Sequence, residues 1–221
     1  NYNTLAYVIE SPLEKGVIWT GSDCGFAHLT RDGGKTWTNV TPAGLPECLI
    51  HSIEVSPHDQ GVAYISATRY KFNDYGAYAY KTTDYGKSWT KINTGIQADD
   101  FLRVIREDKK VKGLLYGGSE RAFYLSYNGG ANWQKTQLNL PVVPVTDLAI
   151  RDNDLVASTA GRAFWILDDL GVFQQYYSHT SFGIFAPKPS YHFGGGAGLP
   201  DKPDLTNGTN APEGVILTYV L

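Results

Sequence analysis

Two adjacent acidic pairs, Asp99-Asp100 and Asp168-Asp169, are the side chains best suited by type to acid–base catalysis. Hydrolysis of a glycosidic bond uses two carboxyl groups that face each other across a cleft. Neighbouring residues on a β-strand point to opposite faces of the sheet, so neither pair forms such a dyad on a strand. In a turn the two groups could converge, although capping a loop is the simpler role. We therefore predict no catalytic residue in this chain.

The arginines and histidines do not form a recognisable catalytic set either. A sialidase-type site needs several arginines around one substrate carboxylate, together with a tyrosine nucleophile. The candidate arginines are spread along the chain: Arg69, Arg103, Arg121 and Arg162. The histidines are isolated from one another: His28, His51, His58, His179 and His192. No grouping of Ser, His and Asp stands out, and we predict no cofactor and no metal.

One stretch, residues 69–78, places aromatic rings and polar groups on a hairpin that is longer than its counterparts. Aromatic faces with flanking hydrogen-bonding groups suit both sugar rings and protein partners. The alternative is that these rings only pack against a neighbouring part of the fold. The candidate binding residues are Arg69, Tyr70, Asp74, Tyr75 and Tyr78.

A short loop that recurs three times, at residues 30–37, 82–89 and 126–133, must position these side chains. Its pattern is Ser/Thr-x-Asp/Asn-x-Gly-x-(Ser/Thr/Asn)-Trp, and the copies are 52 and then 44 residues apart. A period near 45 with one turn motif in each unit is typical of a β-propeller. The motif residues are Asp32, Gly34 and Trp37, then Asp84, Gly86 and Trp89, then Asn128, Gly130 and Trp133.

Each position of this loop has a structural role. The Asp or Asn side chain accepts backbone N–H groups just ahead of it and closes the turn. The glycine permits a left-handed backbone conformation. The tryptophan is expected to be buried under the hairpin, with its indole N–H bonded to a nearby carbonyl. We therefore interpret the loops as structural.

The fold class that follows is all-β, with four consecutive four-stranded antiparallel propeller blades at about 1–45, 46–97, 98–140 and 141–175. The loop of the fourth blade has decayed to residues 168–171. Residues 176–212 have the Pro/Gly-rich composition of a linker or extended tail. Residues 213–221 are expected to form an isolated strand that either begins a further β domain or covers a blade edge. A free-standing four-bladed ring would require the first and fourth blades to close on each other.

Charge and cysteine content narrow the function classes. A net charge of −3 with scattered signs offers no electrostatic footprint for nucleic acid. No run approaches the ~20 apolar residues that a membrane helix needs. Cys24 and Cys48 are too few for a four-ligand zinc site without histidines at the usual spacing. Both lie in loop-like stretches, so one disulfide is possible if the chain is exported.

The three loops resemble the Asp-box, or BNR, repeats of sialidases, sortilin/VPS10-type receptors and xyloglucanase-like glycoside hydrolases. Most of residues 1–170, especially the stretch 161–169, is similar to large exported bacterial proteins described as BNR-repeat glycosyl hydrolases or sortilin-like. The resemblance implies that the chain is the C-terminal part of a longer propeller that leads into a small β-sandwich. It also departs from that group at Cys24, Cys48 and Ala160, and the paired change at the cysteines favours a disulfide.

The hydrolase label in this group comes largely from the repeat itself, so it is weak evidence for chemistry. The sequence therefore favours a non-catalytic binding or scaffolding module of an exported or cell-envelope protein. Its partner would be the remainder of a larger propeller, another protein subunit or a glycan. The alternative is part of a carbohydrate-active glycoside hydrolase whose catalytic groups lie partly outside this chain. A chain that begins at Asn1 is expected to be a piece of something longer.

Overall fold

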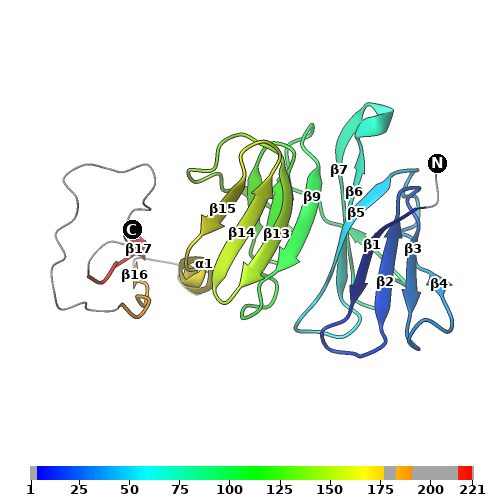
Figure 1. The fold of residues 1–221 in the computed structure, drawn as a ribbon, viewed down its shortest axis with the longest axis horizontal. Helices are drawn as coiled ribbons and strands as arrows, with labels where there is room; N and C mark the ends of the chain where they lie inside the picture. Colours follow the sequence, from blue (N-terminus) through cyan, green and yellow to red (C-terminus); the bar gives the residue numbers. More distant parts are fainter. Residues whose placement is uncertain (1–3, 177–182, 191–213, 221) are drawn as a thin grey trace. The chain divides into compact units, whose positions relative to one another are not determined.

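The computed structural model describes residues 4–176, 183–190 and 214–220. By its internal contacts the chain divides into two units, Asn1–Asp168 and Asp169–Leu221. The first unit consists of four antiparallel sheets in chain order, which we call blades 1 to 4 (Figure 1). Strands within each blade follow one another as a meander, so each hairpin connects neighbours in the sheet.

The first three blades have four strands each, and the fourth strand is always only two residues long. Blade 1 contains β1 (Leu5–Glu10), β2 (Ile18–Ser22), β3 (Ala27–Thr30) and β4 (Thr38–Asn39). Blade 2 contains β5 (Leu49–Val55), β6 (Ala63–Arg69), β7 (Asp74–Thr82) and β8 (Thr90–Lys91), with the 3₁₀ helix η1 (Tyr70–Phe72) between β6 and β7. Blade 3 contains β9 (Leu102–Glu107), β10 (Leu115–Ser119), β11 (Phe123–Ser126) and β12 (Gln134–Lys135).

Blade 4 corrects the expectation of four strands in every blade. Among the described residues it has three: β13 (Val145–Arg151), β14 (Asp154–Thr159) and β15 (Phe164–Leu167). The loop after β15 has no tryptophan to anchor a fourth strand. Asp169 there adopts a left-handed conformation (φ 60°) and accepts the N–H of Gly171, where the short helix α1 (Gly171–Tyr176) begins.

The inner strands β1, β5, β9 and β13 lie side by side. Each pairs with the second strand of its own blade, and the four pairings have the same register. Each carries an irregularity at the same place, so the pairing patterns of the four blades can be superposed. In this register Ile50 and Ile53 of blade 2 correspond to Leu102 and Ile105 of blade 3 and to Val145 and Leu148 of blade 4. All six of these side chains are buried.

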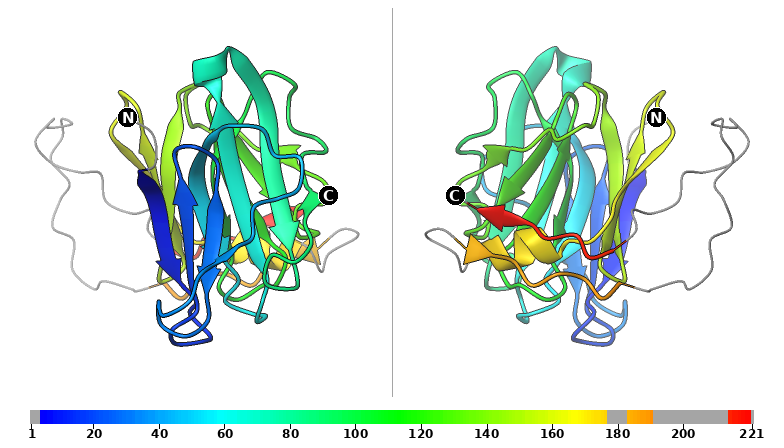
Figure 2. Two further views of the ribbon diagram at one scale, coloured as in Figure 1. Left: turned by 90° about the vertical axis from the view of Figure 1, so that its right-hand side faces the viewer. Right: turned by 90° about the vertical axis from the view of Figure 1, so that its left-hand side faces the viewer.

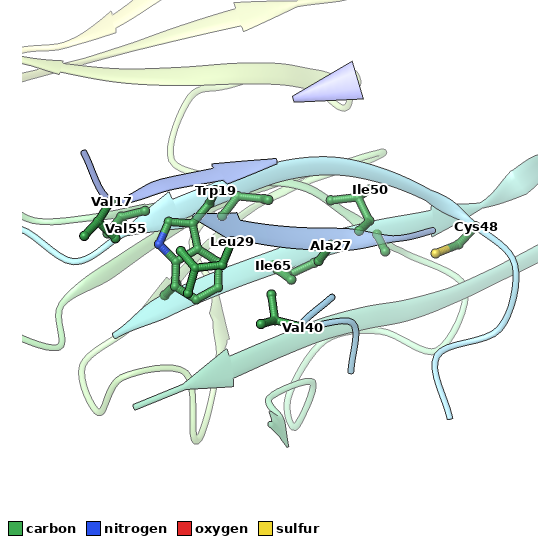
Figure 3. Close-up of a cluster of buried hydrophobic side chains, with 12 residues drawn as sticks. Val17, Trp19, Ala27, Leu29, Val40, Cys48, Ile50, Val55 and Ile65 are labelled. Carbon is green, nitrogen blue, oxygen red and sulfur yellow. The ribbon is translucent and has the colours of Figure 1, made fainter. Parts of the chain in front are cut away.

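These inner-strand residues bury themselves against the preceding blade. Figure 3 shows Ile50 from blade 2 in one cluster with Trp19, Leu29 and Val40 from blade 1. Gly21 of β2 makes room for this packing, because a Cβ there would lie 2.5 Å from Ile50 Cγ2. The apolar core of the first unit therefore lies between successive blades.

The first blade has an uncovered face. Leu5 and Val8 occupy the register positions of Ile50 and Ile53, yet they are 61% and 59% exposed. Closure of blade 4 onto blade 1 would bury these two side chains. The four blades therefore do not form a closed ring by themselves.

In the second unit, β16 (Gly183–Ile184) pairs antiparallel with β17 (Tyr219–Val220). The expectation of an isolated terminal strand is thus wrong, because β17 pairs with β16, which the sequence had placed in the linker. The remaining residues of the Pro/Gly-rich tail, 177–182 and 191–212, lie outside the described residues. In the described ranges no helix combines the length and apolar character needed to cross a membrane.

The shared register predicts unequal effects of two equivalent truncations. Ile53→Ala leaves a cavity between blades 1 and 2 and is expected to lower the free energy of unfolding by ~2–5 kcal/mol. Val8→Ala removes exposed surface and is expected to change it by less than ~0.5 kcal/mol. Urea denaturation of both variants measures the difference. Equal losses of stability would show that the face of blade 1 that carries Val8 is buried, and would contradict its description as uncovered.

Candidate functional site

The three recurring loops, at residues 30–37, 82–89 and 126–133, close their own turns in the same way. Asp32 Oδ1 accepts the N–H groups of Lys35 and Thr36, each at 2.9 Å, and Asp32 Oδ2 accepts the Thr36 hydroxyl at 2.6 Å. Asp84 repeats this with the N–H and hydroxyl of Ser88, and Asn128 accepts the N–H of Asn132. These bonds favour the carboxylate form. The hydroxyl of Thr36 is the largest influence that lowers the pKa of Asp32, and that of Ser88 lowers the pKa of Asp84 to about 2.

The tryptophans of the second and third loops join one blade to the next. The indole N–H of Trp89 donates to the Val40 carbonyl at 2.7 Å, and that of Trp133 donates to the Ile92 carbonyl at 2.8 Å. Val40 directly follows β4 and lies three residues after Trp37. Ile92 directly follows β8 and lies three residues after Trp89. The indole is therefore a contact between sheets as well as within the loop.

The expectation that every motif tryptophan is buried is wrong for Trp37, and Trp89 is only partly buried. Trp133 is 2% exposed, whereas Trp37 is 45% exposed. The indole N–H of Trp37 bonds the Gly34 carbonyl of its own loop at 3.2 Å. The physical reason is that no sheet among the described residues packs on that side of blade 1.

The candidate binding residues of the β6–β7 hairpin form two groups. The first group fixes the hairpin: Arg69 is ion-paired with Asp74, and the Tyr78 hydroxyl donates to Asp74 Oδ2 at 2.7 Å. The hydrogen bond from Tyr78 is the main cause of the lowered pKa of Asp74. Arg69 also donates to the Glu47 carbonyl at 2.9 Å. These three side chains are thus occupied with one another and with the backbone.

The second group presents rings to solvent. Tyr70 and Tyr75 both stack on Phe101, with ring centroids 6.0 and 6.4 Å apart. Phe101 is buried, while Tyr70, Tyr75 and Phe72 remain exposed. The rings therefore both pack on the next blade and offer open faces. We call Tyr70, Phe72 and Tyr75 the aromatic tip; sequence reasoning missed Phe72, although it lies inside the candidate stretch.

The hairpin projects beyond the strands around it, as both views of Figure 2 show for β6, η1 and β7. Asn73 in a left-handed conformation (φ 55°) ends η1 and returns the chain into β7. Arg103 of β9 lies over the rings of Tyr70 and Phe101, at 5.8 and 5.3 Å from their centroids. Residues of blade 3 therefore pack against the aromatic tip of blade 2.

A charged cluster on the inner strands was not foreseen. Its centre is Arg106 of β9, which donates to Asp147 Oδ1 at 2.6 Å, to the Leu148 carbonyl at 2.8 Å and to the Tyr7 hydroxyl at 3.1 Å. It also lies 3.5 Å from Glu54 Oε2. We call Tyr7, Glu54, Arg106 and Asp147 the inner-strand cluster, and each of its members comes from a different blade.

The inner-strand cluster continues towards the aromatic tip. Arg103, three residues before Arg106 in β9, forms an ion pair with Glu120, and its Nη1 lies 3.3 Å from His51 Nε2. Burial, and then the charge of Arg103, lowers the pKa of His51. The sequence signal was the spacing of polar residues three apart on neighbouring inner strands, at 51 and 54 and at 103 and 106.

The acidic pair Asp99-Asp100 does not form a hydrolytic dyad. Asp100 is fully buried and accepts the hydroxyls of Ser119 and Tyr124, whereas Asp99 pairs with Arg121 at the surface. Glu54 and Asp147 are the carboxylates that do converge, and both are bound to Arg106. Burial raises the pKa of Glu54 to about 7 against the attraction of Arg106.

Cys24 and Cys48 are not joined to each other in the structure, so the disulfide that the sequence left open is not formed there. Cys48 is completely buried, and burial raises its pKa to about 12. Cys24 Sγ lies 3.3 Å from the Ser22 hydroxyl. Among the described residues, no group of three or more His, Cys, Asp and Glu side chains is placed to hold a metal ion.

No protein-family model matches the sequence. A curated protein of Neosartorya fischeri named "Probable oligoxyloglucan-reducing end-specific xyloglucanase" is 25% identical over 249 aligned positions, which cover 92% of this chain and 29% of that protein. The chain thus spans less than a third of this relative's length.

Solved structures share the fold at low identity. A structure of YCF48 bound to D1 peptide has a TM-score of 0.55 at 19% identity and covers 76% of this chain and 58% of its own. The GH74 xyloglucanase from Xanthomonas campestris has a TM-score of 0.59 at 15% identity, over 74% and 29%. An extracellular domain assigned to a one component system of B. thetaiotaomicron has a TM-score of 0.55 at 15% identity, over 77% and 21%. The first unit therefore consists of β-propeller blades of the type found in these glycosyl hydrolases and in YCF48.

The raised pKa of Glu54 predicts a pH dependence of stability. Between about pH 4.5 and pH 7 the folded state holds a proton on Glu54 that the unfolded state releases, so this contribution to stability is complete below pH 4.5 and is lost as the pH rises through 7. Relative to Glu54→Gln, the free energy of unfolding of the parent chain should therefore fall by roughly 1–3 kcal/mol from pH 5 to pH 8.

Urea denaturation across that range measures the slope. Asp147→Asn, which removes the other carboxylate bound to Arg106, serves as the matched control and should retain most of the slope, because the charge of Asp147 is the smallest of the influences on the pKa of Glu54. Parallel pH profiles for the parent chain and Glu54→Gln would contradict the assignment of the proton to Glu54.

Proposed function

We propose that this chain is a non-catalytic binding module, and that it binds a protein partner through the aromatic tip. The observation that carries the proposal is the set of exposed rings, Tyr70, Phe72 and Tyr75, on a hairpin whose shape is already fixed. Exposed aromatic side chains contribute much of the binding energy in protein interfaces. Rings held in place before binding lose little conformational entropy when a partner docks.

The polar residues around the tip support a binding role over catalysis. Each nearby carboxylate is neutralised by an arginine: Asp74 by Arg69 and Glu120 by Arg103. A partner therefore meets apolar rings with a balanced polar rim, which is the usual composition of a transient interface. The YCF48 structure with a bound peptide offers a precedent for peptide binding on this fold.

The same proposal places the module in an exported or cell-envelope protein. Support comes from the likeness to the B. thetaiotaomicron extracellular domain and from the resemblance of the Asp-box loops to sortilin-like exported proteins. A glycan is the other ligand class that the exposed rings would suit, because sugar rings stack on aromatic faces.

A second candidate is part of a glycoside hydrolase of the xyloglucanase type. The relative in Neosartorya fischeri matches 92% of this chain, and Glu54 has the raised pKa that a general acid needs. Against it, Glu54 Oε1 accepts the Glu107 N–H at 3.1 Å and Glu54 Oε2 faces Arg106. Catalytic groups of such an enzyme would then lie partly outside this chain.

Binding to a peptide array and a glycan array tests the proposal. Tyr75→Ala is expected to weaken binding to the selected peptide by about tenfold or more, equal to ~1–2 kcal/mol, without changing the unfolding curve. Phe26→Ala is the matched control, because Phe26 is an exposed ring on the corresponding β2–β3 hairpin of blade 1. It should leave binding unchanged.

Three outcomes would contradict the proposal. Equal losses for Tyr75→Ala and Phe26→Ala would show that the aromatic tip is not the binding surface. Tip-dependent binding to glycans alone would replace the protein partner with a carbohydrate. Cleavage of xyloglucan oligosaccharides that Glu54→Gln abolishes would favour the hydrolase.

A further inference from the structure

The interface between blades 1 and 2 has three recurring parts. Ile50 of the second blade packs where Gly21 of the first leaves space. The Trp89 indole donates to the Val40 carbonyl at 2.7 Å. Gly86 lies against the Val40 side chain, because a Cβ on Gly86 would be 2.6 Å from Val40 Cβ.

The interface between blades 2 and 3 repeats the outer two parts. The Trp133 indole donates to the Ile92 carbonyl at 2.8 Å, and a Cβ on Gly130 would lie 2.6 Å from Ile92 Cδ1. Between blades 3 and 4 the inner part recurs, since a Cβ on Gly118 would lie 2.6 Å from Val145 Cγ1. Both the inner and the outer contacts between neighbouring blades thus occur more than once in this chain.

Blade 1 carries one half of this interface, and no described residue of another blade packs against it. Leu5 and Val8 stand where Ile50 and Ile53 do in blade 2, and both are exposed. A Cβ on Gly34 would meet no atom within 4 Å, unlike the Cβ positions of Gly86 and Gly130. The Asp32 hydrogen bonds are complete, so the backbone turn is already closed as in the docked loops, while the indole N–H of Trp37 still bonds the Gly34 carbonyl of its own loop at 3.2 Å. We call Leu5, Val8, Gly34 and Trp37 the open blade face.

We propose that the open blade face binds a further propeller blade that has a complete fourth strand. The partner blade would supply an aliphatic residue at the end of that strand, as Val40 and Ile92 do. This residue would fill the space at Gly34 and accept the indole N–H of Trp37 on its carbonyl. A small residue on the partner's second strand, like Gly21, would receive Leu5 and Val8.

A second copy of this chain does not meet these requirements. Its unpaired end is blade 4, whose three described strands include no counterpart of β4 or β8. The partner is therefore a different blade, and self-association is an outcome that the test must separate.

The test extends the parent chain by one blade. A copy of residues 46–97, which contains Ile92 at the required position, is joined ahead of Asn1, and hydroxyl-radical oxidation of each tryptophan is measured by mass spectrometry. In the parent chain Trp37 should oxidise far more than Trp133. In the extended chain its oxidation should fall to the level of Trp133, and the thermal midpoint should rise.

Two controls make the result specific. Ile92→Asp in the added copy should restore oxidation of Trp37, because a carboxylate cannot fill the space at Gly34. Sedimentation of the parent chain should show a monomer. Unchanged oxidation of Trp37 in the extended chain would overturn the proposal, because the added sequence already forms this interface with blade 3 in the parent chain. A parent dimer that protects Trp37 would overturn it in favour of a second copy.

Discussion

The four sheets are not joined by a strand ladder, so contacts of side chains hold successive blades in order, with the Trp133 N–H to the Thr94 carbonyl, at 2.8 Å, as a backbone contact between blades 2 and 3. In this protein the indole N–H of a loop-motif tryptophan performs that task at the outer edge, where Trp89 bonds the Val40 carbonyl and Trp133 bonds the Ile92 carbonyl. An indole suits this position because one group supplies both a large apolar surface and a directed donor. The carbonyl at the end of a short fourth strand is left free for it, since no fifth strand follows. The self-closed turn around Asp84 or Asn128 fixes the ring before the neighbouring blade is met.

Arg106 provides the corresponding contact near the inner strands. Its guanidinium reaches side chains of blades 1, 2 and 4 from its own place in blade 3. A planar group with five donors can satisfy several acceptors at once, which a lysine could not do. The same crowding removes water from Glu54 and raises its pKa. The blades are thus held together both near the inner strands and at the outer edge. The loop that carries Phe101 therefore lies against the β6–β7 hairpin, where Phe101 holds the rings of Tyr70 and Tyr75 in place.

Local patterns in the sequence were enough to predict the strands of the first three blades, the three closed turns and the stretch that forms the β6–β7 hairpin. Each of these depends on residues close together in the chain. The inner-strand cluster depends on four residues from four blades, and only the register of the inner strands brings them together. The exposure of Trp37 could not be read from a motif identical in kind to its two copies, since burial there depends on a neighbouring blade. The missing fourth strand of blade 4 was signalled by the lost tryptophan, and the pairing of β17 with β16 had no local signal.

The account as a whole requires that the indole of each motif tryptophan reports whether a blade is packed against it. Hydrogen exchange of the indole N–H groups, followed by ¹⁵N NMR on the parent chain, measures this directly. Trp89 and Trp133 should exchange as slowly as backbone amides of the buried strands, whereas Trp37 should exchange at the rate of a solvent-exposed indole. Fast exchange at Trp89 and Trp133, or equal protection of all three, would contradict the account.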